Sequence, residues 1–174
     1  MKTTVLKFFT LSVAIFAFST ISFGQNTDNT TASAGARIVT PLTIKNDGAL
    51  EFGDIISASD ENVVTISPAG ARTATTPEAL LVTASRTPQA AQFTVAGEAS
   101  LGYTVLISES ITLTGATTSE TMTVDNFVHN ANGTLIATET TGKETFSVGA
   151  DLTVEASQAS DIYTGSFTVT VTYE

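Results

Sequence analysis

Few residue types in this chain could support catalysis. The single histidine, His129, precedes an Asn132-Gly133 turn signal and could serve as a base or a metal ligand. No Ser, Cys or carboxylate motif surrounds it, so we interpret it as a solvated side chain. The acids of one loop-rich stretch, Asp54, Asp60 and Glu61, lack the spaced ladder of a calcium loop, and we interpret them as solvated too.

Paired carboxylates could hydrolyse glycosides. The candidates are Glu109, Glu120, Asp125 and Glu139, but nothing in the sequence brings two of them together. The chain also has no Trp to form a sugar-stacking platform. We therefore predict no catalytic, cofactor-binding or metal-binding residue, and a protein that is not an enzyme.

Composition narrows the range of partners. Of seven basic residues, Lys2 and Lys7 lie in the leader described below, which leaves five against 17 acidic residues and a net charge near −12. Such a surface repels phosphate backbones, so we expect no nucleic-acid binding. The absence of cysteine excludes thiolate metal sites, thiol catalysis and disulfides.

Residues 1–24 have the pattern of a cleaved signal peptide. Two lysines precede a short apolar run, residues 8–18, and Ser22-Phe23-Gly24 supplies the small residues of a cleavage site. We expect residues 25–33 to be a flexible polar tail and residues 34–174 to be one domain. The mature chain would have no membrane span, and would reach the periplasm, the outer cell surface or the extracellular space.

Short alternating apolar segments predict β-strands along the rest of the chain. They lie at residues 50–55, 63–66, 79–83, 92–97, 101–107, 111–113, 122–124 and 146–154. No stretch shows a helical period with caps, and alternation is typical of antiparallel sheets with one wet face. We therefore predict an all-β fold, an antiparallel immunoglobulin-like (pilin-like) β-sandwich.

Three local patterns refine this prediction. Residues 34–44 alternate as a first strand, in which Pro41 indicates an edge or a bulge because it lacks an amide donor. Phe127 is out of phase with the strand before it, which predicts a bulge near Asp125-Asn126. Asn132-Gly133 predicts a hairpin turn between the segments that flank it.

The last alternating run, residues 163–173, offers a route to assembly. Phe167, Val169, Val171 and Tyr173 share one face of it, and we predict them to form an assembly strand. Strand edges at the ends of a domain can be completed by a strand from a neighbouring molecule. This route to polymerisation needs no cysteine.

Several segments, in the same order along the chain, resemble the DUF4402 family of small exported bacterial proteins. They cover nearly all of the mature chain: ARIVTPLTI at 36–44, LEFGDI at 50–55, VTISPAGAR at 64–72, QFTVAG at 92–97, MTVDNF at 122–127, FSVGADL at 146–152 and YTGSFTVTVTY at 163–173. The family has no established activity, so the resemblance implies export and fold. A weaker similarity, to fimbrial (pilin-like) and spore-coat-U-like subunits, lies in the alternating last strand and its penultimate Tyr173.

Two functions follow as expectations. The first is an exported, non-enzymatic structural protein of the cell surface, a pilin-like or coat-like subunit whose partner is itself or another surface protein. The alternative is a surface binding or adhesion module that recognises a glycan or a protein through the loops of its sandwich.

Overall fold

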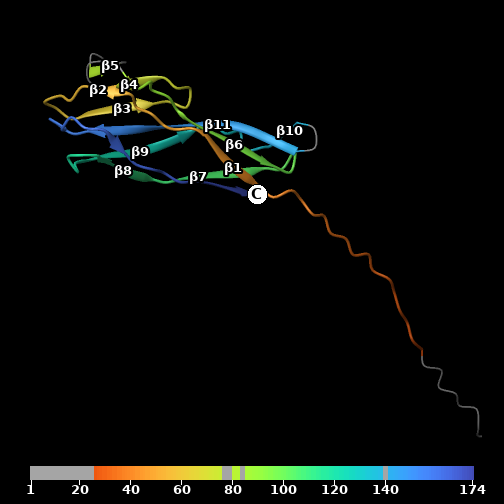
Figure 1. Cartoon of the computed structure of the whole chain (residues 1–174). Helices are drawn as coiled ribbons and strands as arrows, with labels where there is room; N and C mark the ends of the chain where they lie inside the picture. Colours follow the sequence, from red (N-terminus) through yellow and green to blue (C-terminus); the bar gives the residue numbers. More distant parts are fainter. Residues whose placement is uncertain (1–25, 76–79, 83–84, 139–140) are drawn as a thin grey trace, which may run out of the picture. The chain divides into compact units, whose positions relative to one another are not determined.

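The computed structural model describes residues 26–75, 80–82, 85–138 and 141–174 of the chain (Figure 1). Contacts separate residues 1–37 from residues 38–174. Of the first part, residues 26–37 are described, and they are exposed with no helix or strand. The second part is built from antiparallel strands, and its described residues contain no α-helix, so the predicted all-β class is confirmed.

The strands share short lengths, with one exception. They are β1 (Thr43–Gly48), β2 (Asp54–Ile55), β3 (Asn62–Ile66), β4 (Arg72–Ala74), β5 (Leu81–Val82), β6 (Ala91–Gly97), β7 (Tyr103–Ile107), β8 (Ser110–Gly115), β9 (Thr121–His129), β10 (Ile136–Thr138), β11 (Thr141–Val154), β12 (Tyr163–Thr164) and β13 (Val169–Tyr173).

The long strand β11 organises the largest sheet, in the order β1-β6-β11-β9-β8-β12. Along one edge β11 pairs first with β6 and then with β3, and along the other edge first with β10 and then with β9. Figure 1 shows β10 near one end of β11 and β3 near the other. The change of partner from β6 to β3 falls at Gly149, where a Cβ would overlap the carbonyl oxygen of Ile66.

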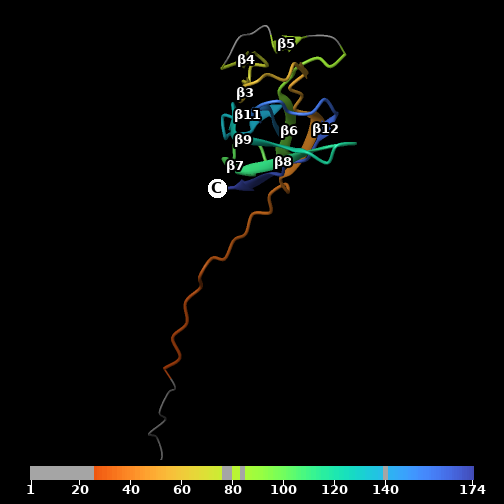
Figure 2. The same ribbon diagram turned by 90° about the vertical axis from the view of Figure 1, so that its left-hand side faces the viewer.

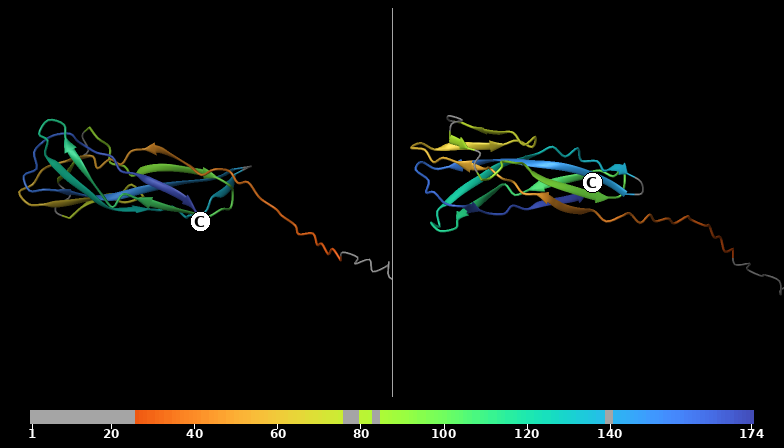
Figure 3. Two further views of the ribbon diagram at one scale, coloured as in Figure 1. Left: turned by 90° about the horizontal axis from the view of Figure 1, so that it is seen from below. Right: turned by 45° about the horizontal axis from the view of Figure 1, so that its top comes forward.

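Two small sheets complete the domain. β7 pairs with β13, and β2 pairs with β5. In Figure 2 the label of β7 and the C-terminus lie at the opposite side of the domain from β4 and β5. The C-terminal strand lies on the near face when the domain is seen from below (Figure 3).

Two apolar clusters form the core, and β11 contributes to both because its even-numbered residues from 144 to 154 are buried. Buried members of the first cluster are Phe52, Val64, Ile66, Ala90, Val124, Ala150, Leu152 and Val154. Those of the second cluster are Ala91, Phe93, Val95, Tyr103, Leu135, Phe146 and Val148. Phe127 packs against both clusters.

The bulge predicted near Asp125-Asn126 is confirmed. The register of β9 on β11 shifts there, so that two residues of β9 stand opposite one of β11. Asn126 takes the left-handed conformation, with φ of 50°. The extra residue turns Phe127 inward between the two clusters, which explains why its position is out of phase in the sequence.

The hairpin predicted at Asn132-Gly133 is wrong. β9 and β10 both pair with the same edge of β11, so they cannot pair with each other. The chain between them instead leaves β11 and meets the start of β7, where Tyr103 N donates to Gly133 O and Leu135 N donates to Leu101 O. Gly133 has φ of +76°, a backbone conformation that favours glycine, although it closes no hairpin.

Both terminal strands differ from their predicted lengths. The first begins only at Thr43, because β6 ends at Gly97 and Pro41 has no N–H to donate. The last run, residues 163–173, divides into β12 on β8 and β13 on β7. Since β7 and β8 belong to different sheets, the chain must change sheets between them.

Candidate functional site: the edge of the terminal strand

The predicted assembly strand faces the core with its side chains. Phe167, Val169, Val171 and Tyr173 all pack, half-buried, against the second cluster. Phe167 is the anchor: its ring centroid lies 4.9 Å from that of Phe127 and 6.1 Å from that of Phe93. These side chains hold β13 in place, and what the strand can offer a partner is its backbone edge.

The hydroxyl of Tyr173 fixes the end of this strand. It donates to the carbonyl oxygen of Thr40 at 2.8 Å and accepts from the amide of Glu98 at 2.6 Å. The carboxylate of Glu98 in turn accepts from the amide and the hydroxyl of Thr40. The residues just before β1 are therefore tied to the penultimate residue of the chain.

The hydrogen-bond pattern shows which backbone groups of β13 point away from β7. Ser108 N donates to Thr168 O, and Glu174 N donates to Gly102 O, so the even-numbered residues of β13 form the hydrogen-bonded pairs with β7. Pairs alternate along an antiparallel ladder. The N–H and C=O groups of Val169, Val171 and Tyr173 therefore point to the outer edge.

No strand among the described residues pairs with that outer edge. β1 contacts β13, yet β1 pairs with β6 and β13 pairs with β7. Leu42, just before β1, and Ile44 in β1 are half-buried against the second cluster, as are β13's own residues. The domain thus presents an unpaired strand edge next to an apolar surface that is only partly covered.

The segment before β1 is the second unusual feature. Residues 26–41 are all exposed, and no strand includes them. Ile38 has 97 % of its surface exposed, the highest fraction among the exposed large apolar side chains of the described residues. An apolar residue so placed in a segment with strand-like alternation is a candidate contact.

The residues that the sequence analysis weighed for catalysis or metal binding have structural roles or lie at the surface. The Nδ1 atom of exposed His129 accepts from Ala131 N, and the carboxylate of Asp54 accepts from the amides of Ser85 and Arg86. Glu120 accepts from the side chain of Gln158. Within the described ranges, no three His, Asp or Glu side chains gather as metal ligands.

Two of the candidates, His129 and Glu109, line one hollow. It measures about 390 Å³, lies between β7 and β9, and is otherwise lined by Val105, Ile107, Ser108, Asn126 and Phe127. Asp125 pairs with Ser110 just beyond it, at the start of β8. The candidate Glu139 lies outside the described residues.

One buried carboxylate, that of Glu144, is not among the residues that the sequence predicts for a site. Glu144 is 6 % exposed and accepts from the hydroxyl of Tyr103 at 2.8 Å and from Asn132 N. Burial, followed by the hydrogen bond to Glu144, raises the pKa of Tyr103 above its ordinary value. The alternation of the strand indicates that Glu144 is buried, because it is in phase with the inward residues Phe146 and Val148. This pair secures residues 130–135 against β7.

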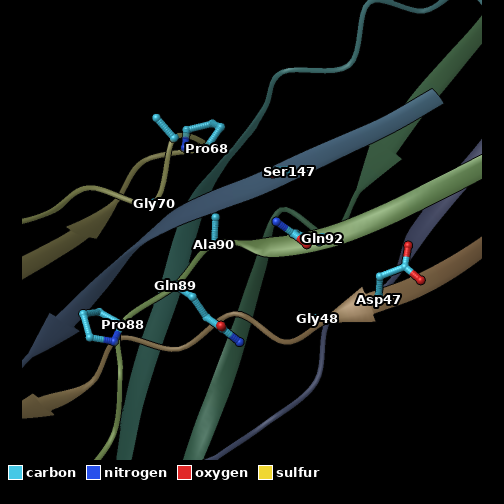
Figure 4. A pocket seen from close by; sticks show the side chains of 10 residues that line it. Asp47, Gly48, Pro68, Gly70, Pro88, Gln89, Ala90, Gln92 and Ser147 are labelled. Carbon is cyan, nitrogen blue, oxygen red and sulfur yellow. The ribbon is translucent and has the colours of Figure 1, made fainter.

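A second hollow, of about 310 Å³, would serve a binding module. Pro68 and Pro88 stand on one side of it and Asp47 on the other, with Gln89 and Gln92 between them (Figure 4). The carboxylate of Asp47 is engaged by Lys45 and Thr94, which hold its pKa below the ordinary value. No aromatic side chain lines the hollow, so it has no stacking surface for a sugar.

Comparison with known proteins gives a family. The model of the family described as a domain of unknown function, DUF4402, matches residues 42–173. The chain therefore belongs to the DUF4402 family. Searches among curated proteins and among solved structures found no match. In the part of the chain that the structure describes, no helix has the length and apolar character to cross a membrane.

Proposed function

We propose that this protein is an exported, non-enzymatic structural protein of the cell surface that assembles through strand edges. The observation that carries the proposal is the outer edge of β13, where Val169, Val171 and Tyr173 direct backbone groups away from β7 without a strand partner in the described chain. A neighbouring strand can complete such an edge with main-chain hydrogen bonds.

Export is part of the proposal. Residues 1–24 act as a cleaved leader, and the mature domain is an immunoglobulin-like sandwich of the pilin-like kind. The chain lacks cysteine, so neither a lipid anchor on cysteine nor a disulfide would hold it at the surface. Main-chain pairing between subunits supplies the cohesion instead, as a pilin-like or coat-like subunit would require.

The binding-module alternative has less support. Its natural site is the hollow of Figure 4, which is lined by proline, amide and small side chains. Glycan recognition usually exploits an aromatic platform, and the chain has no Trp. The unpaired edge favours assembly.

The test is to block the edge without touching the core. Thr170 and Thr172 are exposed on β13, and lysine there opposes edge pairing. The matched control places lysines at Leu106 and Thr104, their exposed register partners on β7. The full chain, purified after export, should form oligomers or filaments by light scattering and negative-stain microscopy. Thr170→Lys/Thr172→Lys should abolish them, and Thr104→Lys/Leu106→Lys should not. Equal assembly of both variants would refute use of this edge.

A further inference from the structure

We propose that residues 34–39 of one copy add as a β-strand to the outer edge of β13 in a second copy. This inference rests on the proposed function and names the two surfaces that meet in it. One surface is the segment that the sequence predicts as a strand but that no sheet includes. The other is the strand edge that the domain leaves unpaired.

The donor segment has the pattern of a half-buried strand. Ala34, Ala36 and Ile38 fall on one face of an extended chain, and Gly35, Arg37 and Val39 fall on the other. Residues 34–39 are exposed and outside every strand. The alternation of this segment would bury apolar side chains only if a partner covered one of its faces. Among the described residues of its own chain, none covers Ile38, which is 97 % exposed.

The acceptor matches the donor in length and character. The residues whose backbone N–H and C=O groups point to the outer edge are Val169, Val171 and Tyr173, and they span the five positions of β13. Five or six residues of an added strand would pair with them. On the inner face the side chains of these three residues are only half-buried, so Ala36 and Ile38 would extend the apolar surface of the second cluster.

Charge also favours this occupant. Arg37 is the only charged residue between positions 29 and 41, whereas residues 42–174 carry four basic and 16 acidic side chains. A segment with one cation approaches an acidic domain more readily than a second acidic surface does. A second copy of the chain supplies such a segment.

The arrangement predicts the form of the assembly. Each copy carries one donor segment and one acceptor edge, so donation can pass from one copy to the next as a head-to-tail contact, whereas reciprocal exchange would close a dimer. A head-to-tail contact that does not close into a ring produces a filament. The hydrogen bond from the Tyr173 hydroxyl to Thr40 O places the residue that follows the donor segment beside the end of β13 in the same copy.

The first experiment alters the donor and leaves the domain intact. Ala36→Asp/Ile38→Asp puts two charges on the proposed inner face, and Thr30→Asp/Thr31→Asp adds the same charge to the same exposed segment outside it. Melting temperatures should be unchanged in both, since all four positions are exposed. The large species seen with the unaltered chain should be lost, at least tenfold in amount, only in Ala36→Asp/Ile38→Asp.

The outcomes separate the two claims. If the unaltered chain assembles and Ala36→Asp/Ile38→Asp assembles equally, the donor inference is overturned while assembly stands. If the unaltered chain never assembles, the proposed function is overturned and the inference with it.

A cross-link decides between pairing within one chain and pairing between chains. The chain has no cysteine, and a Cβ at Gly35 meets no atom within 4 Å, so Gly35→Cys/Thr170→Cys is a clean pair. After oxidation, a non-reducing gel should show a ladder of multimers, whereas each single-cysteine variant should stop at a dimer. A monomer that carries an internal disulfide, or an unlinked monomer, would overturn pairing between copies.

Discussion

The hydroxyl of Tyr173 lies 2.8 Å from the carbonyl oxygen of Thr40, and this hydrogen bond joins the last strand to the residues that precede the first strand. The same hydroxyl accepts from Glu98 N, at the end of β6. One side chain thus connects β13, the end of β6 and the base of the exposed segment. The penultimate tyrosine therefore has a structural role that does not depend on assembly.

Replacing Tyr173 with Phe tests this role. Tyr173→Phe removes both hydrogen bonds while keeping the ring, so the free energy of unfolding should fall by about 1–2 kcal/mol. Urea denaturation followed by circular dichroism measures it. Thr172→Ala, at the adjacent exposed position, should change the value by less than about 0.5 kcal/mol. A Tyr173→Phe protein as stable as the unaltered one would contradict the role.

The second cluster should depend strongly on Phe146. Its side chain is 1 % exposed and stacks on Phe93, with ring centroids 5.6 Å apart. Phe146→Ala should cost about 3–5 kcal/mol of unfolding free energy, because it leaves a cavity in the second cluster beside Phe93. Leu106→Ala, at a side chain 71 % exposed, should cost less than about 0.5 kcal/mol. Similar losses for both would place the core elsewhere.

Gly149 should tolerate no side chain. A Cβ there would overlap the carbonyl of Ile66 and the backbone at Ser67 and Pro68, where β11 changes partner. Gly149→Ala should therefore destabilise the domain by about 1–3 kcal/mol or more, since the backbone must shift. Gly35→Ala is the control, because its Cβ meets no atom within 4 Å. An unchanged melting temperature for Gly149→Ala would contradict the close approach of Gly149 to the backbone at Ile66.

The turn at Asp161 should make stability depend on pH. Its carboxylate accepts from the amides of Thr118 and Thr117, and these hydrogen bonds hold its pKa well below the ordinary value. A depressed folded-state pKa stabilises the fold above the unfolded pKa of about 3.9, and this contribution is lost as the pH falls through the lower folded value.

Asp161→Asn should accordingly melt at a lower temperature than the unaltered chain at pH 7. The difference should narrow as the pH falls below about 3.9. Calorimetry across this range measures it, with Asp60→Asn as a control at an exposed loop position. A difference that stays constant down to about pH 2 would show that the carboxylate charge has no part in it.

Local alternation was a sound guide to the strands in the middle of the domain. The inward phase of β11 and the bulge at Asn126 could both be predicted, because a half-buried strand must repeat every two residues and a bulge must break that repeat. Which strands pair with one another could not be predicted from the sequence. That β11 changes from β6 to β3 at Gly149 depends on contacts between residues far apart in the chain.

The candidate site was predictable only in part. Phe167, Val169, Val171 and Tyr173 do share a face, but the same pattern fits a strand that covers its own core and one that covers a partner's core. Which backbone groups of β13 remain unpaired follows from the register with β7, and the sequence does not specify that register. The failed hairpin at Asn132-Gly133 has the same cause, since β11 competes for both flanking segments.

The most direct test of assembly is the mass of the full chain after export, measured by light scattering during size-exclusion chromatography over a wide range of concentrations. Assembly through the edge of β13 predicts species larger than a monomer, with a mass that rises with concentration. A monomer at every concentration would contradict it.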